Sequence, residues 1–260
     1  MDYHALLDNM FGLEGKVAVV TGATKGLGKT VAGMLSESGA KVALCSRNND
    51  EAILAAKIIE ERTGNKTFGM GADVSRKADV DAFISAVESE LGTVDILIAC
   101  AGINIRKEIP ELTEDDWSAI QDINVKGSFL TAQAVLPGMR EKQWGRIIFL
   151  GSMLSFISIK GRAAYSSSKA ALLGLTRTFA LETASEGICV NAVCPGPFKT
   201  PMNVAVYDDP EKNGEFLQKL PIGRWGDPEE LRGLFLYLSS NACSYMTGSS
   251  IVIDGGWTAQ

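Results

Sequence analysis

The alternation of short apolar runs with longer amphipathic stretches constrains the fold of this chain more than any other feature. The apolar runs, rich in β-branched residues, predict strands at residues 16–21, 41–46, 66–71, 95–100, 145–151, 188–194 and 250–255. The stretches between them predict helices near residues 27–38, 50–63, 76–91, 114–139, 163–186 and 228–240. Such alternation is typical of parallel βαβ units, and nearly continuous apolar strands indicate a sheet covered on both faces. We therefore expect an α/β fold with a doubly wound sheet of seven parallel strands.

The pattern continues without a linker or an internal repeat. A chain of 260 residues could form two domains, but α/β folds of this size are routinely one. We expect an N-terminal extension at residues 1–12 and a single Rossmann domain at residues 13–260. The one long segment without a regular pattern, about residues 197–222, follows the sixth strand and is a candidate substrate lid at the carboxyl edge of the sheet.

Composition argues against several classes of protein. No apolar run approaches the ~18 residues of a membrane span, and the N-terminus lacks the basic and apolar regions of a secretory signal. We therefore expect a cytoplasmic protein without a membrane partner. The net charge of -6, with no Lys/Arg cluster, argues against nucleic acid. The only histidine is His4, and the five cysteines show no CxxC spacing, so we expect free thiols and no metal site.

The turn after the first strand has the composition of a dinucleotide site. Its sequence, TGATKGLG, holds Gly22, Gly26 and Gly28, which allow tight turning and close approach of a ligand to the backbone. The helix that follows offers unpaired N–H groups to a pyrophosphate. The glycine spacing differs from the GxGxxG pattern, so the prediction of a dinucleotide site depends on the position of the segment in the first βα turn. The alternative is a glycine-rich turn that binds no ligand. The other expected contacts in this turn are Thr24, Lys25 and Leu27.

The end of the second strand indicates which dinucleotide binds. It reads Ser46, Arg47, Asn48, without the acid that would hold the ribose hydroxyls of NAD. Ser46 leaves room for a 2′-phosphate, which Arg47 can bind with its guanidinium group and Lys25 can also reach. We therefore expect NADP(H); the alternative is that both cations are solvated surface charges.

Asp73 follows the third strand, with Val74 beside it. If a dinucleotide lies across this edge of the sheet, these residues face its adenine. Alternatively, Asp73 caps the helix that begins near Arg76.

Four residues have the chemistry of carbonyl reduction. Tyr165 and Lys169, in YSSSK, lie four apart at the start of a predicted helix and so share one face. A tyrosine titrates near pH ~10, and a nearby ammonium group favours its phenolate, which makes it usable as a proton donor and acceptor. Ser152 ends the fifth strand, where its hydroxyl can bind the substrate oxygen. Asn124, a poor helix former in a predicted helix, could hold a water near the lysine.

From about Leu13 to Trp257, the chain closely resembles the short-chain dehydrogenase/reductase family. The matching segments are TGATKGLG, ADV (72–74), AG (101–102), INVKG (123–127), GSM (151–153), YSSSK (165–169) and CPGPFKT (194–200). The resemblance implies a tetrad in which Tyr165 is the acid and base, and Lys169 binds the nicotinamide ribose and lowers the tyrosine's pKa. It further implies that Ser152 polarises the carbonyl and that Asn124 orders a relay water.

The resemblance also implies further cofactor contacts and an assembly. The cofactor contacts that we expect toward the nicotinamide end are Cys100, Ala101, Gly102, Tyr165, Lys169, Pro195, Gly196, Phe198 and Thr200. Family members are usually homotetramers that pack through the last strand and two long helices.

One segment departs from the family pattern. The family usually reads Asn-Asn-Ala-Gly after the fourth strand, whereas this chain reads Ala99-Cys100-Ala101-Gly102. Because the family's cofactor contact there is largely backbone, we expect Cys100 to weaken a brace of the strand end without abolishing turnover.

The segments RWGDPEEL, PGPFKT and AGINIR resemble gluconate 5-dehydrogenases, and similar tails occur in 3-oxoacyl-[acyl-carrier-protein] reductases. Five basic residues could pair with a substrate carboxylate or be solvated loop charges: Arg106, Lys107, Lys160, Arg162 and Lys199. We expect an NADP(H)-dependent oxidoreductase that interconverts a carbonyl and a secondary alcohol, its substrate a sugar acid or similar small polar keto compound. The alternatives are a 3-oxoacyl-[acyl-carrier-protein] reductase and a dinucleotide-sensing or scaffold protein on the same fold.

Overall fold

The computed structural model describes residues 3–260 and confirms a single, seven-stranded parallel sheet, in the order β3-β2-β1-β4-β5-β6-β7. The strands are β1 (Val17–Thr21), β2 (Lys41–Ser46), β3 (Thr67–Gly71), β4 (Ile96–Ala99), β5 (Gly145–Leu150), β6 (Ile188–Pro195) and β7 (Ser250–Ile253). Each end lies within two residues of the predicted position. The prediction succeeds because strands buried on both faces consist almost wholly of apolar residues.

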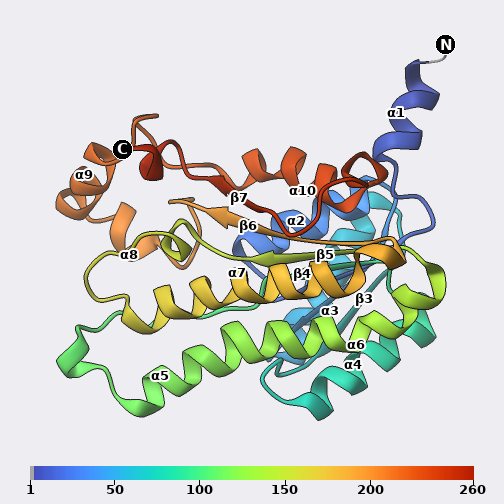
Figure 1. Ribbon diagram of the computed structural model, residues 1–260, viewed down its shortest axis with the longest axis horizontal. Coiled ribbons are helices and arrows are strands. Elements are labelled where there is room, and N and C mark those ends of the chain that lie inside the picture. The colour runs from blue at the N-terminus through green and yellow to red at the C-terminus, as the bar shows by residue number, and fades with distance from the viewer. Residues whose placement is uncertain (1–2) are drawn as a thin grey trace.

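Helices cover both faces of the sheet (Figure 1). The α-helices of the described residues are α1 (Tyr3–Phe11), which extends away from the sheet, α2 (Gly26–Glu37), α3 (Asn49–Thr63), α4 (Lys77–Glu90), α5 (Glu114–Gln121), α6 (Gly127–Lys142), α7 (Ala163–Thr183), α8 (Val204–Tyr207), α9 (Pro210–Gln218) and α10 (Arg232–Ser239). One apolar core joins the sheet to α4, α6 and α7, and a second joins its other face to α2, α3 and α10. Among residues 3–260, no helix combines the length and the apolar character needed to cross a bilayer.

Two predicted elements differ from the structure. The helix expected at residues 114–139 is divided into α5 and α6 by a π-helical turn at Asp122–Lys126. The segment 197–222, which lacked a regular pattern, contains α8 and α9. A local signal marks α9: Asp209 accepts hydrogen bonds from two backbone N–H groups of its first turn, and Pro210 occupies its first position.

The second half of this segment and the chain that follows it are anchored by aromatic packing. Phe216 stacks on Trp225 with ring centroids 5.4 Å apart, and it meets Trp257 edge-on at 5.2 Å. The Trp225 indole N–H donates to Asn213 Oδ1 at 2.7 Å. These contacts pack α9 against Trp225 and Trp257.

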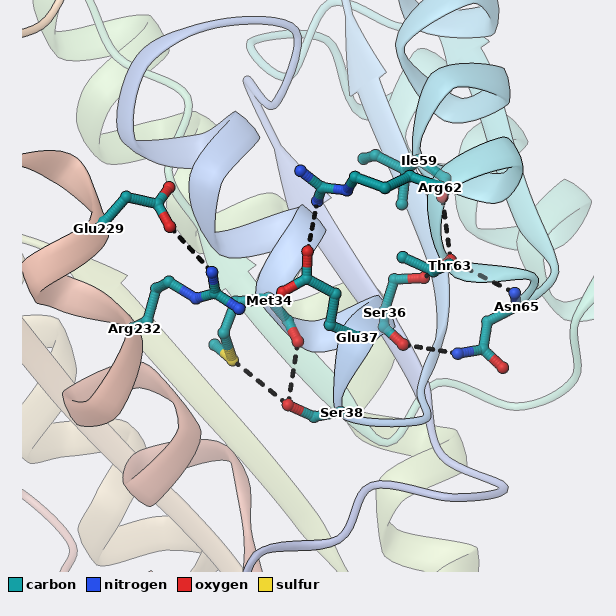
Figure 2. A network of polar contacts seen from close by, with 10 residues as sticks. All are labelled: Met34, Ser36, Glu37, Ser38, Ile59, Arg62, Thr63, Asn65, Glu229 and Arg232. Carbon is teal, nitrogen blue, oxygen red and sulfur yellow. Dashed lines mark hydrogen bonds and ion pairs between the residues drawn. The ribbon is translucent and has the colours of Figure 1, made fainter.

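A polar network ties together three helices on one face of the sheet (Figure 2). Glu37 at the end of α2 pairs with Arg62 of α3 at 2.9 Å and with Arg232 of α10. Arg232 also pairs with Glu229 at 2.8 Å. These side chains are partly exposed, so each ion pair contributes little to stability.

The strand order changes direction between β1 and β4. Val19 of β1 pairs with Ala43 on one side and with Leu97 on the other, so the chain leaves these central strands toward opposite halves of the sheet. The loops after β1 and β4 then separate and leave a crevice at the carboxyl edge, where open α/β sheets bind their ligands.

Candidate active site

A cavity of ≈ 670 Å³ occupies this crevice. Its volume lies within the range of small-molecule sites, about 300–1,000 Å³. It is lined by every residue expected to contact a cofactor, and also by Ser152, Tyr165 and Lys169. Of the four residues expected to be catalytic, only Asn124 is absent from its wall.

The wall also contains residues that were not predicted from the sequence. They are Cys45, Glu51, Ala72, Ile103, Asn104, Ile123, Leu150, Gly151, Pro201, Met202 and Asn203. Most of them adjoin a predicted residue in the chain, so extending each motif by a few positions would have found them.

The turn after β1 requires its glycines. Gly22 and Gly26 have φ of +67° and +59°, in the left-handed region that favours glycine. A Cβ on Gly22 would lie 2.7 Å from Ala101 Cα, and a Cβ on Gly28 would lie 2.6 Å from Gly22 O. Lys25, the residue before α2, makes no side-chain hydrogen bond to the helix end. The turn therefore packs against the loop after β4 and leaves backbone N–H groups of α2 available to an anion.

The loop after β4 is braced from β1. Thr21 Oγ1 accepts hydrogen bonds from the backbone N–H groups of Cys100 and Ala101 at 3.1 and 3.0 Å. A Cβ on Gly28 would lie 3.2 Å from Cys100 Sγ, so the thiol packs against the glycine turn. We expected Cys100 to weaken a brace of this strand end. In the structure the Thr21 hydroxyl supplies such a brace.

Asn124 holds the same loop further along. Its Oδ1 accepts from Ile103 N at 2.8 Å, and its Nδ2 donates to Ile103 O at 3.0 Å and to Ser168 Oγ at 2.9 Å. The residue is completely buried and lies in the π-helical turn, a distortion that is frequent at functional sites. Both donors of its amide are therefore taken by protein atoms, and the side chain acts as a clamp on the loop.

Tyr165 and Lys169 lie in the first two turns of α7, and Ser152 follows the end of β5. Burial raises the pKa of Tyr165 to about 12, while the hydrogen bond with Ser152 and the charge of Arg162 act in the opposite direction. Lys169 Nζ donates to Leu150 O at 2.6 Å and lies 5.7 Å from the centroid of the tyrosine ring. Burial lowers the pKa of Lys169 to about 8. The site thus pairs a tyrosine that strongly retains its proton with a buried amine.

The other end of the cavity carries the residues expected near the adenosine. Ser46 Oγ donates to Asn48 O at 2.8 Å, and Asn48 Oδ1 caps α3 by accepting from two backbone N–H groups. Arg47 is exposed and lines both this cavity and a smaller neighbouring one, together with Asp73. Asp73 Oδ1 accepts from the backbone and the hydroxyl of Ser75, so it stabilises the turn before α4 and does not cap the helix itself.

The basic residues near the mouth separate into two groups. Lys107 is paired with Asp116 at 2.6 Å, which neutralises it, and Lys160 and Lys199 are exposed. Arg106, which is also exposed, donates to Met202 O and Asn203 Oδ1, and the partly buried Arg162 donates to Gly161 O. Within the described residues 3–260, neither of these two arginines has an acidic partner.

These two arginines also influence each other and the tyrosine. Burial and the charge of Arg106 lower the pKa of Arg162 to about 10. Both guanidinium groups act on the Tyr165 hydroxyl. The mouth of the site therefore concentrates uncompensated positive charge beside Tyr165.

Comparison with known proteins relates this arrangement to a family. A family model described as enoyl-(acyl carrier protein) reductase matches residues 22–258. A 3-oxoacyl-[acyl-carrier-protein] reductase of Vibrio cholerae is 38% identical over 244 residues, which cover 94% of this chain and 98% of that protein. A 2-dehydro-3-deoxy-D-gluconate 5-dehydrogenase of Dickeya dadantii is 35% identical over 255 residues, which cover 97% and 99%.

Solved structures agree with these relatives. A short-chain type dehydrogenase/reductase from Mycobacterium marinum matches with a TM-score of 0.92 and 40% identity, covering 98% of this chain and 100% of that one. A gluconate 5-dehydrogenase from Burkholderia cenocepacia, in complex with NADP and tartrate, matches with a TM-score of 0.93 and 34% identity, covering 97% and 98%. The chain therefore belongs to the short-chain dehydrogenase/reductase family, and it is an oxidoreductase of keto or alcohol substrates.

Proposed function

We propose that this protein is an NADP(H)-dependent oxidoreductase that interconverts a ketone and a secondary alcohol in a sugar acid or a similar small polar keto compound. One observation carries the proposal: the hydroxyls of Tyr165 and Ser152 and the amine of Lys169 line the same cavity as the glycine-rich turn. Proton-transfer groups and a dinucleotide cradle thus share one enclosed space, as a hydride transfer coupled to a proton transfer requires.

The cavity fits a dinucleotide phosphate. Gly22 and Gly28 let the turn pack closely, because a Cβ on either would clash with backbone atoms, and the start of α2 can bind a pyrophosphate. Arg47 and Lys25 line the adenosine end and would hold a 2′-phosphate beside Ser46. At the nicotinamide end the proposed contacts are the segment 100–102, Pro195, Gly196, Phe198 and Thr200. When bound, NADP(H) supplies or accepts the hydride.

The protein's own residues then manage the proton. In the reducing direction, Ser152 donates a hydrogen bond to the carbonyl oxygen, and Tyr165 gives its proton to that oxygen as negative charge develops. The pKa of Tyr165, raised to about 12 by burial, keeps the hydroxyl protonated and suits it to the acid role. In the oxidising direction the tyrosine must ionise, and the cationic groups around it, Lys169 and Arg162 among them, favour that ionisation.

The substrate class is proposed from the charges at the mouth. Among residues 3–260, Arg106 and Arg162 have no acidic partner, and a carboxylate on the substrate would satisfy both guanidinium groups. The likeness to the gluconate 5-dehydrogenase in complex with NADP and tartrate supports this choice. A 3-oxoacyl-[acyl-carrier-protein] reductase is the second candidate, favoured by the 38% identity to the Vibrio cholerae enzyme. The net charge of -6 disfavours docking of an acidic carrier protein.

Titration with NADPH and, separately, with NADH tests the cofactor, with nicotinamide fluorescence as the readout. We expect preferential binding of NADPH, lost in Arg47→Asp and retained in Arg177→Asp, a matched charge reversal at an exposed position of α7 outside the cavity. A wild-type preference for NADH would mean that Arg47 and Lys25 are only surface charges. Binding of neither nucleotide would contradict the proposed reaction.

Tyr165→Phe separates an enzyme from a dinucleotide sensor. We expect this variant to bind NADPH as the wild type does and to lose turnover of keto-sugar acids, because phenylalanine has no proton to give. A wild type that binds NADPH but reduces neither keto-sugar acids nor 3-oxoacyl thioesters would favour the sensor. The homotetramer and the cytoplasmic location stay predictions, the first of which light scattering in solution tests.

A further inference from the structure

The adenosine end of the cavity carries acids as well as bases. Lys25 and Arg47, the cations proposed to hold a 2′-phosphate, line the cavity together with two carboxylates, those of Glu51 and Asp73. The side chains of Lys25, Arg47 and Glu51 are exposed, so a ligand in the cavity can reach them. A site that bound only a phosphorylated dinucleotide would gain from positive charge alone. The two acids therefore call for an explanation.

Asp73 has a structural role that accounts for it. Its Oδ1 accepts hydrogen bonds from the backbone N–H and the hydroxyl of Ser75 at 3.0 and 2.7 Å. These bonds hold the turn before α4, so this carboxylate is already engaged by protein donors.

Glu51 has no comparable set of partners. Its Oε1 accepts one long hydrogen bond, 3.3 Å from Asn48 Nδ2, and no lysine or arginine among residues 3–260 pairs with it. Asn48 directly follows Arg47, and its carbonyl accepts from the Ser46 hydroxyl at 2.8 Å. The contact with Asn48 therefore places the Glu51 carboxylate at the end of β2, beside the residues proposed to meet the adenosine ribose.

A carboxylate at this point acts differently on the two nicotinamide dinucleotides. NADP(H) carries a phosphate on the 2′-oxygen of that ribose, with a charge of about −1.5 to −2 at neutral pH, and a carboxylate repels it. In NAD(H) the same oxygen is a hydroxyl, which a carboxylate binds as an acceptor. The end of β2 lacks such an acid, and Glu51 supplies one from the first turn of α3.

We propose that Glu51 makes this cavity accept both dinucleotides, because its carboxylate repels the 2′-phosphate of NADP(H) and accepts a hydrogen bond from the 2′-hydroxyl of NAD(H). The inference rests on the proposed function and adds NAD(H) to it as a second cofactor. Arg47 and Lys25 favour the phosphorylated dinucleotide, and Glu51 reduces that preference.

The dissociation constants of NADPH and NADH, measured by nicotinamide fluorescence for the wild type and Glu51→Gln, test the proposal. The wild type should bind both dinucleotides, NADPH more tightly. In Glu51→Gln the dissociation constant of NADPH should fall about fivefold, because repulsion between exposed charges is removed, while that of NADH does not fall. The gain should shrink in high salt. Glutamine can replace glutamate in the third position of a helix, so the Tm should stay unchanged.

Two further variants show whether the effect is local. Asp50→Asn removes the same charge one residue earlier, from an exposed side chain of α3 outside the cavity wall, and should change the NADPH/NADH ratio less than about twofold. Glu51→Lys should raise the preference for NADPH beyond that of Glu51→Gln. A wild type that does not bind NADH, an unchanged ratio in Glu51→Gln, or an equal change in Asp50→Asn would overturn the inference.

Nucleotides without nicotinamide separate this inference from the proposed reaction. Calorimetric titration with adenosine 2′,5′-bisphosphate and with AMP reports on the adenosine end alone. If the wild type reduces no ketone, but Glu51→Gln binds the bisphosphate about fivefold more tightly and AMP no more tightly, the proposed reaction fails and the inference stands. If the wild type reduces keto-sugar acids with NADPH, but Glu51→Gln binds the bisphosphate as the wild type does, the inference alone fails.

Discussion

Replacement of Asn124 by alanine gives the sharpest test of how the site is built. The change removes three hydrogen bonds, two to the backbone of Ile103 and one to Ser168 Oγ, all at a completely buried residue. Each such bond contributes about 1 kcal/mol net, so the free energy of unfolding should fall by about 3 kcal/mol. In a chain of this length that corresponds to a decrease in Tm of about 6 °C.

Calorimetry or urea unfolding measures this loss, and Thr131→Val is the matched control. Thr131 is also buried, and its hydroxyl bonds only to carbonyls within α6, so its replacement should cost no more than about 1 kcal/mol. Because Asn124 fixes the loop between the proposed ribose contact and the lid, Asn124→Ala should also weaken NADPH binding. A loss of stability no greater than that of Thr131→Val would refute the clamp. A variant of unchanged stability that lost only kcat would return Asn124 to the relay role implied by the family resemblance.

Three further expectations test other parts of the structure. Gly28→Ala should lose affinity for NADPH, because its Cβ would lie 2.6 Å from a carbonyl oxygen of the turn; nicotinamide fluorescence measures this, and wild-type affinity would contradict the close approach. Glu37→Gln should lower the free energy of unfolding by no more than about 1 kcal/mol for each of its partly exposed pairs with Arg62 and Arg232. That loss, measured in urea, should shrink in high salt, and a salt-independent loss would argue against ion pairing. Finally, the pKa of Lys169 is about 8 in the folded protein, against 10.5 for a lysine side chain in water, so between these pH values the unfolded state binds more protons and stability should rise with pH. Lys169→Met should remove that rise, and an equal rise in both proteins would show that another group causes it.

Most of the fold and the outline of the site follow from local sequence patterns. The seven strands were predicted within two residues because each is an apolar run bounded by turns, and burial on both faces demands that composition. The glycine-rich turn and the YSSSK segment were recognisable because all the residues of each motif lie within eight consecutive positions of the chain. In these cases the physical cause lies within the segment itself.

The clamp and the braces depended on tertiary structure. No sequence pattern shows that Thr21 would brace the loop that carries Cys100. Nor does one show that Asp116 would neutralise Lys107 while Arg162 has no acidic partner among residues 3–260. The π-helical turn around Asn124 could not be predicted from the sequence either, because a helix interrupted by one such turn has nearly the periodicity of a continuous helix.

The sequence by itself therefore determined the order of the strands along the chain, the glycine-rich turn and the hydroxyl and amine groups that we propose as the proton-transfer residues. Only the tertiary structure decided which polar groups meet, which stay unpaired and how far burial shifts their pKa values. Hydrogen bonds and desolvation depend on atoms that are distant in the chain, whereas turn and strand formation depends on neighbours.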